Sequence, residues 1–269
     1  MIPICLSIAG SDSSGGAGIQ ADLKTFASLG CYGATVITAL TAQNTKGIRS
    51  ILDTEPEFVK KQLEAVLEDL PVSVIKIGML CNPGIVQAVV DVLSQTSIPI
   101  VLDPIRFSTS GTALFDDDRK PLFGDLLPIC SLITPNRREA FWLAGVPGES
   151  DVSMEAIGDK LIQMGTDAVL ITGGDVVGER KKDCLKVKQD DDQIYTRLYE
   201  HDTVDTRNSH GTGCTLSSAI SAYLAKGNSL IQSVDLAISY VQECLKQSVH
   251  FQTGKGNGGL NHFHHGVNP

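Results

Sequence analysis

The residues best suited to chemistry in this 269-residue chain lie in the stretch 208–220, with the sequence NSHGTGCTLSSAI. A turn containing Gly211 and Gly213 runs straight into small and apolar residues, which predicts the start of a helix. Glycine lets a ligand approach the main chain closely. The first amides of a helix lack partners inside it and lie at the positive end of its dipole. The stretch therefore predicts a site for a phosphate or another compact anion, with Thr212 inside it.

Cys214 falls in the first turn of this predicted helix. The positive potential at a helix N-terminus lowers the pKa of a thiol and favours the thiolate. The other interpretation is a glycine turn that caps a buried helix, with Cys214 as a small core residue. A glycine motif alone does not decide between the two.

A second glycine-rich loop, residues 10–18 (GSDSSGGAG), stands between an apolar run predicted to be a strand (2–9) and a predicted helix (19–29). Its spacing is not that of the dinucleotide fingerprint GxGxxG. It is not a P-loop either, because Gly16 and Ala17 occupy the places of the lysine and the serine or threonine. We expect a ligand to approach this backbone, but the loop does not identify a nucleotide.

Polar residues follow several predicted strands at the point where each strand ends. Gln43 comes after the strand at 34–40, and its carboxamide offers a donor and an acceptor side by side, suited to the edge of an aminopyrimidine-like ring. A glutamine in a solvated loop is the alternative. Asp103 follows the strand at 98–102, where a carboxylate serves Mg²⁺ or phosphate chemistry, or caps the next turn.

Asn136 and Glu139 follow the predicted strand at 131–134 and share one face of a helix start. One use of such a pair is to direct a carboxylate and an amide at a bound metal. The other is a capping box, with Asn136 as N-cap, and the two uses are compatible. A second capping box is predicted at 54–57 and a third at 229–232.

Strands and helices alternate along the chain without a repeat or a Pro/Ser-rich linker, which predicts a mostly parallel sheet with helices on both faces. The segments 184–187 and 193–198 form a predicted antiparallel hairpin. We expect a single domain over residues 1–269. In such sheets ligands bind where strands lead into loops, and the following residues hold those places: Gly10, Gln43, Met79, Asp103, Asn136, Gly173 and Gly211.

Composition excludes several classes of function. A formal net charge of −9 argues against a nucleic-acid-binding surface. The sequence contains no apolar run of membrane-spanning length, and we expect no signal peptide, because the first residues lack a basic leader and resemble a strand. The seven cysteines include no CxxC pair, which favours a reducing, cytoplasmic location. The histidine-rich segment 262–265 is interpreted as a polar terminus, with metal binding as the less favoured alternative.

The chain resembles the hydroxymethylpyrimidine/phosphomethylpyrimidine kinases of thiamin biosynthesis, which have the ribokinase-like, three-layer αβα fold. The similar segments are 9–25 (AGSDSSGGAGIQADLKT), 42–45 (AQNT), 76–80 (KIGML), 134–136 (TPN), 210–215 (HGTGCT), 254–256 (GKG) and 262–264 (HFH). The resemblance implies an ATP- and Mg²⁺-dependent kinase that phosphorylates 4-amino-5-hydroxymethyl-2-methylpyrimidine and then its monophosphate. It also implies a small-molecule partner and a homodimer.

The resemblance further implies roles for individual residues. Gln43 would bind the aminopyrimidine ring, and Gly211 to Cys214 would form the anion hole for the γ-phosphoryl group, with Cys214 as general base. The ring would be surrounded by Gly10, Ala17, Asp22 and Met79. Contacts to Mg²⁺ or the nucleotide phosphates would come from Asn136, Glu139, Asp103, Thr172, Gly173 and Thr212.

The chain departs from the family pattern at three positions. Thr172 and Asp175 replace a common lysine and histidine, so the resemblance implies only a neutral hydrogen bond from Thr172. Arg106 replaces a usual methionine, where it either contacts phosphate or points to solvent. Because some pyridoxal kinases share the threonine, a pyridoxal or pyridoxine kinase is the alternative function, and Gln43 argues against it. A third hypothesis is a ligand-binding protein without activity, which Cys214 and the glycine loops argue against.

Overall fold

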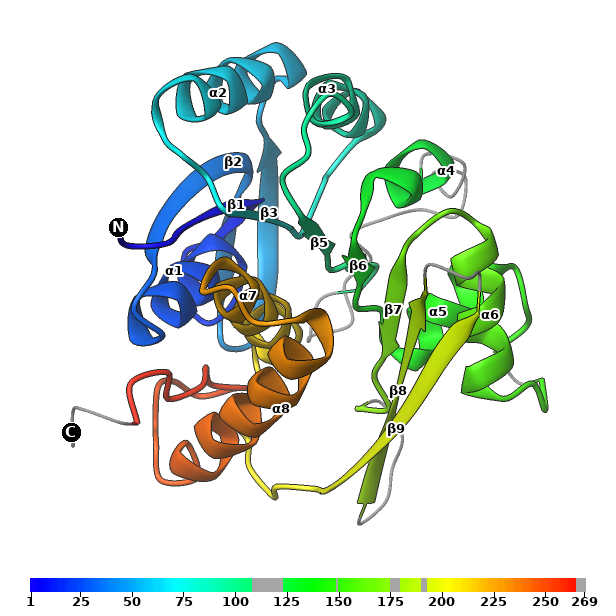
Figure 1. Cartoon of the computed structure of the whole chain (residues 1–269). Helices are drawn as coiled ribbons and strands as arrows, with labels where there is room; N and C mark the ends of the chain where they lie inside the picture. Colours follow the sequence, from blue (N-terminus) through cyan, green and yellow to red (C-terminus); the bar gives the residue numbers. More distant parts are fainter. Residues whose placement is uncertain (108–122, 149, 175–179, 190–192, 265–269) are drawn as a thin grey trace.

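The computed structural model describes residues 1–107, 123–148, 150–174, 180–189 and 193–264 (Figure 1). Its centre is a nine-stranded sheet in the order β3-β2-β1-β4-β5-β6-β7-β8-β9. The strands are β1 (Ile4–Asp12), β2 (Tyr32–Asn44), β3 (Gly47–Asp53), β4 (Val74–Ile77), β5 (Ile100–Leu102), β6 (Leu132–Ile133), β7 (Ala168–Ile171), β8 (Arg180–Lys188) and β9 (Ile194–Asp202).

The middle of the sheet is parallel, from β2 through β1, β4, β5 and β6 to β7. Both edges are antiparallel, because β3 pairs with β2 on one side and β8 and β9 extend the other. The sequence predicts the second of these hairpins but misses the first. β3 escapes notice because it is an edge strand without a buried residue, so it lacks an apolar signal.

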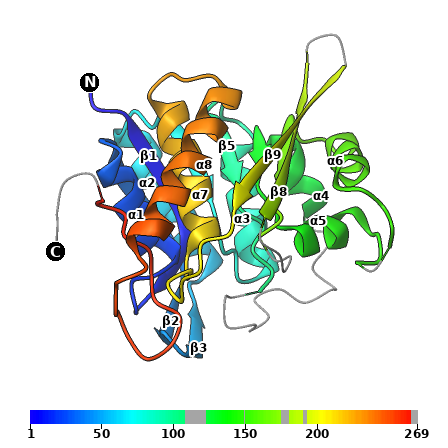
Figure 2. The same ribbon diagram turned by 90° about the horizontal axis from the view of Figure 1, so that it is seen from below.

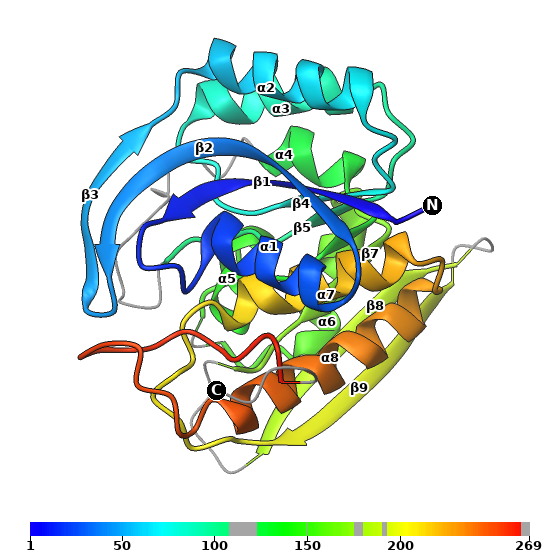
Figure 3. The same cartoon turned by 90° about the vertical axis from the view of Figure 1, so that its left-hand side faces the viewer.

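Helices cover both faces of the sheet, which confirms the three predicted layers (Figures 1 and 3). One face is packed by α2, α3, α5 and α6 and contains the larger apolar core. The other carries α1, α7 and α8. The helices are α1 (Gly18–Ser28), α2 (Pro56–Asp69), α3 (Pro83–Leu93), α4 (Phe123–Leu126) with a 3-10 turn (Leu127–Ile129), α5 (Arg137–Ala144), α6 (Met154–Gln163), α7 (Thr212–Ala225) and α8 (Leu230–Gln247).

The structure contains two of the three capping boxes that the sequence predicts. At α5 the side chain of Asn136 accepts from the backbone of Glu139, and the Glu139 carboxylate accepts in return. Ser229 and Gln232 do the same at α8. The capping box predicted at 54–57 is wrong, since α2 begins after Glu55, whose side chain makes no capping bond. Pro56 alone supplies the start there.

The parallel strands all run in one direction, so their carboxyl ends lie together at one end of the sheet, next to the N-terminus of α7. The segment leading into α7 and the last described residues run along this end of the sheet, so distant parts of the chain lie together there (Figures 2 and 3). No helix in the described residues is both long and apolar enough to cross a membrane.

Candidate active site

A cavity of about 820 Å³ lies at the carboxyl ends of the strands. This is the size range of pockets for small ligands. Most of the residues predicted from the sequence line it: Gly10, Ala17, Gln43, Met79, Asp103, Asn136, Glu139, Thr172, Gly211, Thr212, Gly213 and Cys214. Asp22 and Gly173 are not among the lining residues.

The N-terminus of α7 forms one wall of the cavity. Gly211 is the N-cap, with φ of +84°, and Thr212, Gly213 and Cys214 make the first turn. A side chain on Gly211 would overlap the carbonyl oxygen of Gly16, so the two glycine loops are in direct contact. The backbone geometry thus agrees with the predicted anion site, because both loops approach the cavity without side chains.

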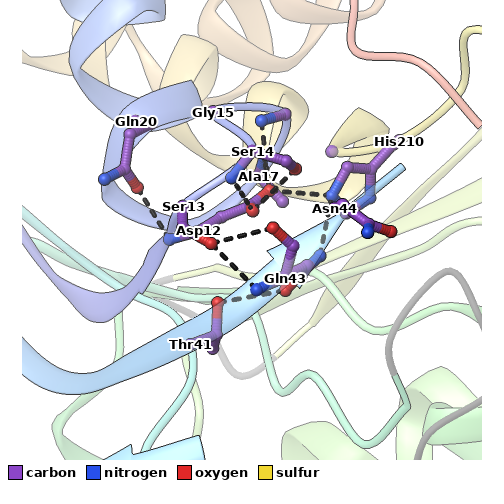
Figure 4. A network of polar contacts seen from close by, with 12 residues as sticks. Asp12, Ser13, Ser14, Gly15, Ala17, Gln20, Thr41, Gln43, Asn44 and His210 are labelled. Carbon is purple, nitrogen blue, oxygen red and sulfur yellow. Dashed lines mark hydrogen bonds and ion pairs between the residues drawn. The ribbon is translucent and has the colours of Figure 1, made fainter. Parts of the chain in front are cut away.

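Asp12 holds the first glycine loop in shape (Figure 4). One carboxylate oxygen accepts hydrogen bonds from the amide and hydroxyl of Ser14, at 2.8 and 2.7 Å. The other accepts from the amides of Gly16 and Ala17. Burial disfavours the charged carboxylate, but hydrogen bonds from His210 and Ser14 outweigh it and lower the pKa of Asp12 to about 2. Asp12 is therefore ionised at neutral pH.

His210 joins this loop to Gln43 at the end of β2. Its Nε2 atom lies 2.8 Å from a carboxylate oxygen of Asp12 and 3.0 Å from one end of the Gln43 carboxamide. The other end of that carboxamide lies 3.3 Å from the hydroxyl of Thr41. Gln43 is thus flanked by polar groups on both sides, near the carboxyl end of β2, where this strand pairs with β3 in the edge hairpin (Figure 4).

Asp22 lies beneath the cavity wall, where the sequence predicts a ligand contact. It is fully buried, and its carboxylate accepts hydrogen bonds from Ser7 at 2.6 Å and Ser218 at 2.7 Å. It also pairs with the ammonium group of Lys76, which is itself fully buried and lines the cavity. Asp22 therefore does not reach the cavity itself, but it positions the ammonium group of Lys76, which does.

The charge state of Cys214 differs from the prediction. Burial raises the pKa of its thiol to about 12, although the positive charge of Lys76 and an amide of Gly18 act against this. The predicted lowering is wrong because the site excludes water, and desolvation outweighs the helix N-terminus. Burial likewise raises the pKa of Asp103 to about 6, again opposed by Lys76. Lys76 is thus the cation that both groups share.

Glu139 connects the start of α5 to the loop after β5. One of its carboxylate oxygens accepts the amide of Arg106 at 3.0 Å, and the other accepts the amide of Asn136 at 2.9 Å. The guanidinium of Arg106 lies over the ring of Trp142, 4.8 Å from its centre, and does not line the cavity. Arg106 is half-buried and packs on Trp142, so the alternative in which it points to solvent is wrong, whereas the phosphate contact stays a prediction.

Oxygen ligands for a metal come from few residues. Within the described residues, the side-chain carboxylate of Asp103 accepts a hydrogen bond from the hydroxyl of Ser217 at 3.4 Å. The described residues contain no group of three or more His, Cys, Asp or Glu side chains suited to a metal ion. Mg²⁺ bound to phosphates needs only one or two carboxylates, so Asp103 with Glu139 nearby is compatible with that ion.

The far end of the cavity lies against β8 and β9. Thr172 lines it, whereas the amide of Gly173 turns away and donates to the buried carboxylate of Asp183. That carboxylate also bonds His201, and this raises the pKa of the imidazole. Asp175 lies outside the described residues.

Sequence reasoning missed three residues that organise the site: Asp12, Lys76 and His210. Asp12 and His210 were visible only as parts of longer motifs, since their partners are distant in sequence. Lys76 carried a usable signal, because a lysine inside the apolar strand VIKI needs a buried partner. The partner, Asp22, could not be located from spacing.

Comparisons with known proteins agree with this geometry. The sequence model of the phosphomethylpyrimidine kinase family matches residues 12–261. The hydroxymethylpyrimidine/phosphomethylpyrimidine kinase of Rhizobium meliloti (strain 1021) is 43% identical, over 98% of each chain. The crystal structure of phosphomethylpyrimidine kinase from Clostridium difficile 630 has 41% identity and a TM-score of 0.78, covering 91% of this chain and 100% of that one. An ADP complex of Bacillus subtilis pyridoxal kinase has 29% identity and a TM-score of 0.86, with 97% and 98% covered.

Proposed function

This chain belongs to the phosphomethylpyrimidine kinase family, and from that premise we propose that it is a two-step pyrimidine kinase. It transfers the γ-phosphoryl group of ATP to the hydroxymethyl group of 4-amino-5-hydroxymethyl-2-methylpyrimidine, and a second one to the monophosphate, in thiamin diphosphate biosynthesis. The observation that carries the proposal is the position of Gln43 and the α7 N-terminus in one cavity. A ring-binding group and an anion site thereby face one ligand.

The ring of the pyrimidine binds against Gln43, with Gly10, Ala17 and Met79 around it. This position directs the hydroxymethyl group to Gly211–Cys214. The amides there stabilise charge on the transferring phosphoryl group, and the water-excluding site strengthens that interaction. Phosphoryl transfer needs mainly this positioning and charge stabilisation, with little covalent chemistry from the protein. After the first transfer, a phosphate oxygen of the monophosphate becomes the acceptor.

Cys214 takes the proton of the attacking hydroxyl group, and it does so as a thiolate. Because burial raises the pKa of this thiol to about 12, the thiolate is scarce at neutral pH. The positive charge of Lys76 favours it. Lys76 is therefore the group that keeps a base available in a buried site.

The nucleotide phosphates lie near Asn136, Thr172 and Thr212, which line the cavity beyond the anion hole. Asp103 and Glu139 would hold Mg²⁺, directly or through water, because oxygen ligands suit this ion. When bound, Mg²⁺ neutralises charge on the phosphates. Gly173 supports the wall through its bond to Asp183 rather than by touching the ligand.

The test is to incubate the purified protein with ATP, Mg²⁺ and either the pyrimidine or pyridoxal, and to identify products by mass. We expect the pyrimidine monophosphate first and the diphosphate later. The similarity to pyridoxal kinases favours pyridoxal as the second candidate substrate. Pyridoxal phosphate as the sole product would replace the pyrimidine assignment, and turnover of neither substrate would leave the ligand-binding hypothesis.

We also propose that the enzyme acts in the cytoplasm as a homodimer. All seven cysteines are buried and none forms a disulfide, which supports a reducing compartment. Sedimentation of the purified protein at micromolar concentration tests the homodimer, and a species of 28.7 kDa would contradict it.

A further inference from the structure

The hydrogen on His210 Nε2 can be located from its partner. Nε2 lies 2.8 Å from an oxygen of Asp12. That oxygen already accepts the amides of Gly16 and Ala17. An ionised carboxylate has no hydrogen to donate, so the imidazole must donate. His210 therefore carries its hydrogen on Nε2, and this atom cannot also accept one.

The carboxamide of Gln43 must agree with that assignment. As drawn in Figure 4, its Nε2 end lies 3.0 Å from His210 Nε2, which would place two donors face to face. Its Oε1 end lies 3.3 Å from the Thr41 hydroxyl, whose one hydrogen has a nearer acceptor in the carbonyl of Ser11 at 3.0 Å. In this orientation the first contact is therefore unfavourable, and the second competes with the Ser11 carbonyl for a single hydrogen.

A half-turn of the carboxamide about its last bond exchanges the nitrogen and the oxygen and moves no other atom. The oxygen then shares the single Nε2 hydrogen of His210 with the Asp12 carboxylate in a three-centre hydrogen bond, and the nitrogen donates to the Thr41 hydroxyl oxygen. No two donors then face each other in the chain from Asp12 through His210 and Gln43 to Thr41. Flanking groups at both ends then hold the carboxamide in one orientation.

We propose that His210, oriented by Asp12, together with Thr41 fixes the carboxamide of Gln43 with its oxygen toward His210, and that this orientation selects amino-pyrimidines over oxo-pyrimidines. The inference rests on the proposed function, since it concerns the ring that the kinase would bind. It makes His210 and Thr41 positioning residues for substrate choice.

The selection follows from the pattern of donors and acceptors. A 4-aminopyrimidine presents an amino donor beside a ring-nitrogen acceptor, and these pair with the oxygen and the nitrogen of a carboxamide. The 4-oxo analogue presents an oxygen acceptor beside a ring N–H donor, which is the reverse order. The ring cannot turn over to compensate, because its hydroxymethyl group must stay at Gly211–Cys214. The 4-oxo ring would pair with Gln43 only if its carboxamide made a half-turn that exchanged the oxygen and the nitrogen.

The first measurement needs no substrate turnover. Long-range ¹H–¹⁵N correlation spectra of the ¹⁵N-histidine-labelled protein report which imidazole nitrogen of His210 carries the hydrogen, with His210→Gln used to assign the signal. We expect a protonated Nε2 at neutral pH. An unprotonated Nε2 would overturn the proposed orientation whatever the enzyme phosphorylates.

The second measurement compares kcat/KM for the amino substrate with kcat/KM for its 4-oxo analogue. His210→Phe removes the donor, so the ratio should fall about ten- to hundredfold. His210→Gln, which can donate from a similar position, should keep most of the ratio. Thr41→Val should reduce it by a smaller factor. The control is His250→Phe, an exposed histidine outside the cavity, which should leave the ratio unchanged.

The outcomes separate this inference from the proposed function. If the wild-type protein phosphorylates neither pyrimidine, the proposed function fails, and the spectra still judge the orientation. If the wild-type protein is active and His210→Phe and Thr41→Val both keep the wild-type ratio, the positioning role is wrong. A ratio that falls in His210→Phe and returns in His210→Gln supports it, because loss of packing alone would not be restored by a donor.

Discussion

The ammonium group of Lys76 lies 3.0 Å from both carboxylate oxygens of Asp22, and neither side chain is exposed to solvent. Asp22 lies on α1 and Lys76 on β4, so the pair joins the helix layer to the sheet at the wall of the cavity. Ser218, one turn after Cys214 on α7, bonds the same carboxylate. The pair thus links three elements that position the site.

Breaking this pair should destabilise the protein strongly. Asp22→Ala leaves a buried ammonium without its partner, and we expect a loss of about 3–5 kcal/mol in the free energy of unfolding. Urea denaturation measures it. The control is Glu64→Ala, which removes an exposed partner of Lys60 at 4.0 Å and should cost less than about 1 kcal/mol. Equal losses of unfolding free energy in the two variants would show that the buried pair stabilises the protein no more than the exposed pair does.

The rate of phosphoryl transfer should rise with pH if Cys214 acts as thiolate. Its pKa of about 12 means that more thiolate forms throughout the range from pH 7 to 10. Lys76→Met should move this profile to higher pH, because the cation that favours the thiolate is gone. Cys214→Ala should flatten it.

The matched control for that experiment is Cys31→Ala. Cys31 is as buried as Cys214, with 6% of each side chain exposed, but it does not line the cavity. It should keep the wild-type profile. A profile that is flat in the wild-type enzyme would exclude Cys214 as the base.

Asp103→Asn should stabilise the protein and inactivate it. Because the pKa of Asp103 is raised to about 6, folding favours its protonated form, and the charged form costs stability as pH rises from about 4 through 6. The shift corresponds to about 3 kcal/mol at pH 8. Thermal unfolding should therefore show a gain for the variant at pH 8 and almost none at pH 4. A gain independent of pH would contradict this cause.

Gly211→Ala should destabilise the protein more than Gly227→Ala. Both glycines have a positive φ, +84° and +87°, so each variant bears backbone strain of about 1 kcal/mol or more. Only at Gly211 would the new methyl group meet the carbonyl of Gly16, whereas nothing lies within 4 Å at Gly227. Unfolding free energies and kcat for both variants measure the difference. If the two lose the same stability, the close contact of the glycine loops is unimportant.

Local sequence predicts most of the site because parallel strands bring their carboxyl ends together. Asp103 and Asn136 follow a strand, and Gly10 and Gln43 lie in the last residues of β1 and β2, which run further than the sequence predicts. That position was enough to place all four around one cavity. The capping box of Asn136 and Glu139 was equally readable, since it involves residues three apart.

Properties that depend on burial or on distant partners were not predictable. The helix N-terminus correctly placed Cys214, but its pKa depends on how much water the folded site excludes. The contact between Asp12 and His210 joins residues 198 positions apart. The edge strand β3 carried no apolar pattern, because it faces solvent along its length.

The contact between the two glycine loops sets when the enzyme can become active during its own synthesis. Loop 10–18 leaves the ribosome well before α7, which begins at Thr212. Chain growth at about 5–20 residues per second separates the two by roughly 10–40 seconds. Until α7 emerges, loop 10–18 lacks its contact with Gly211, and Asp12 lacks its hydrogen bond with the imidazole of His210. A nascent chain therefore cannot bring the two glycine loops into contact before α7 has emerged.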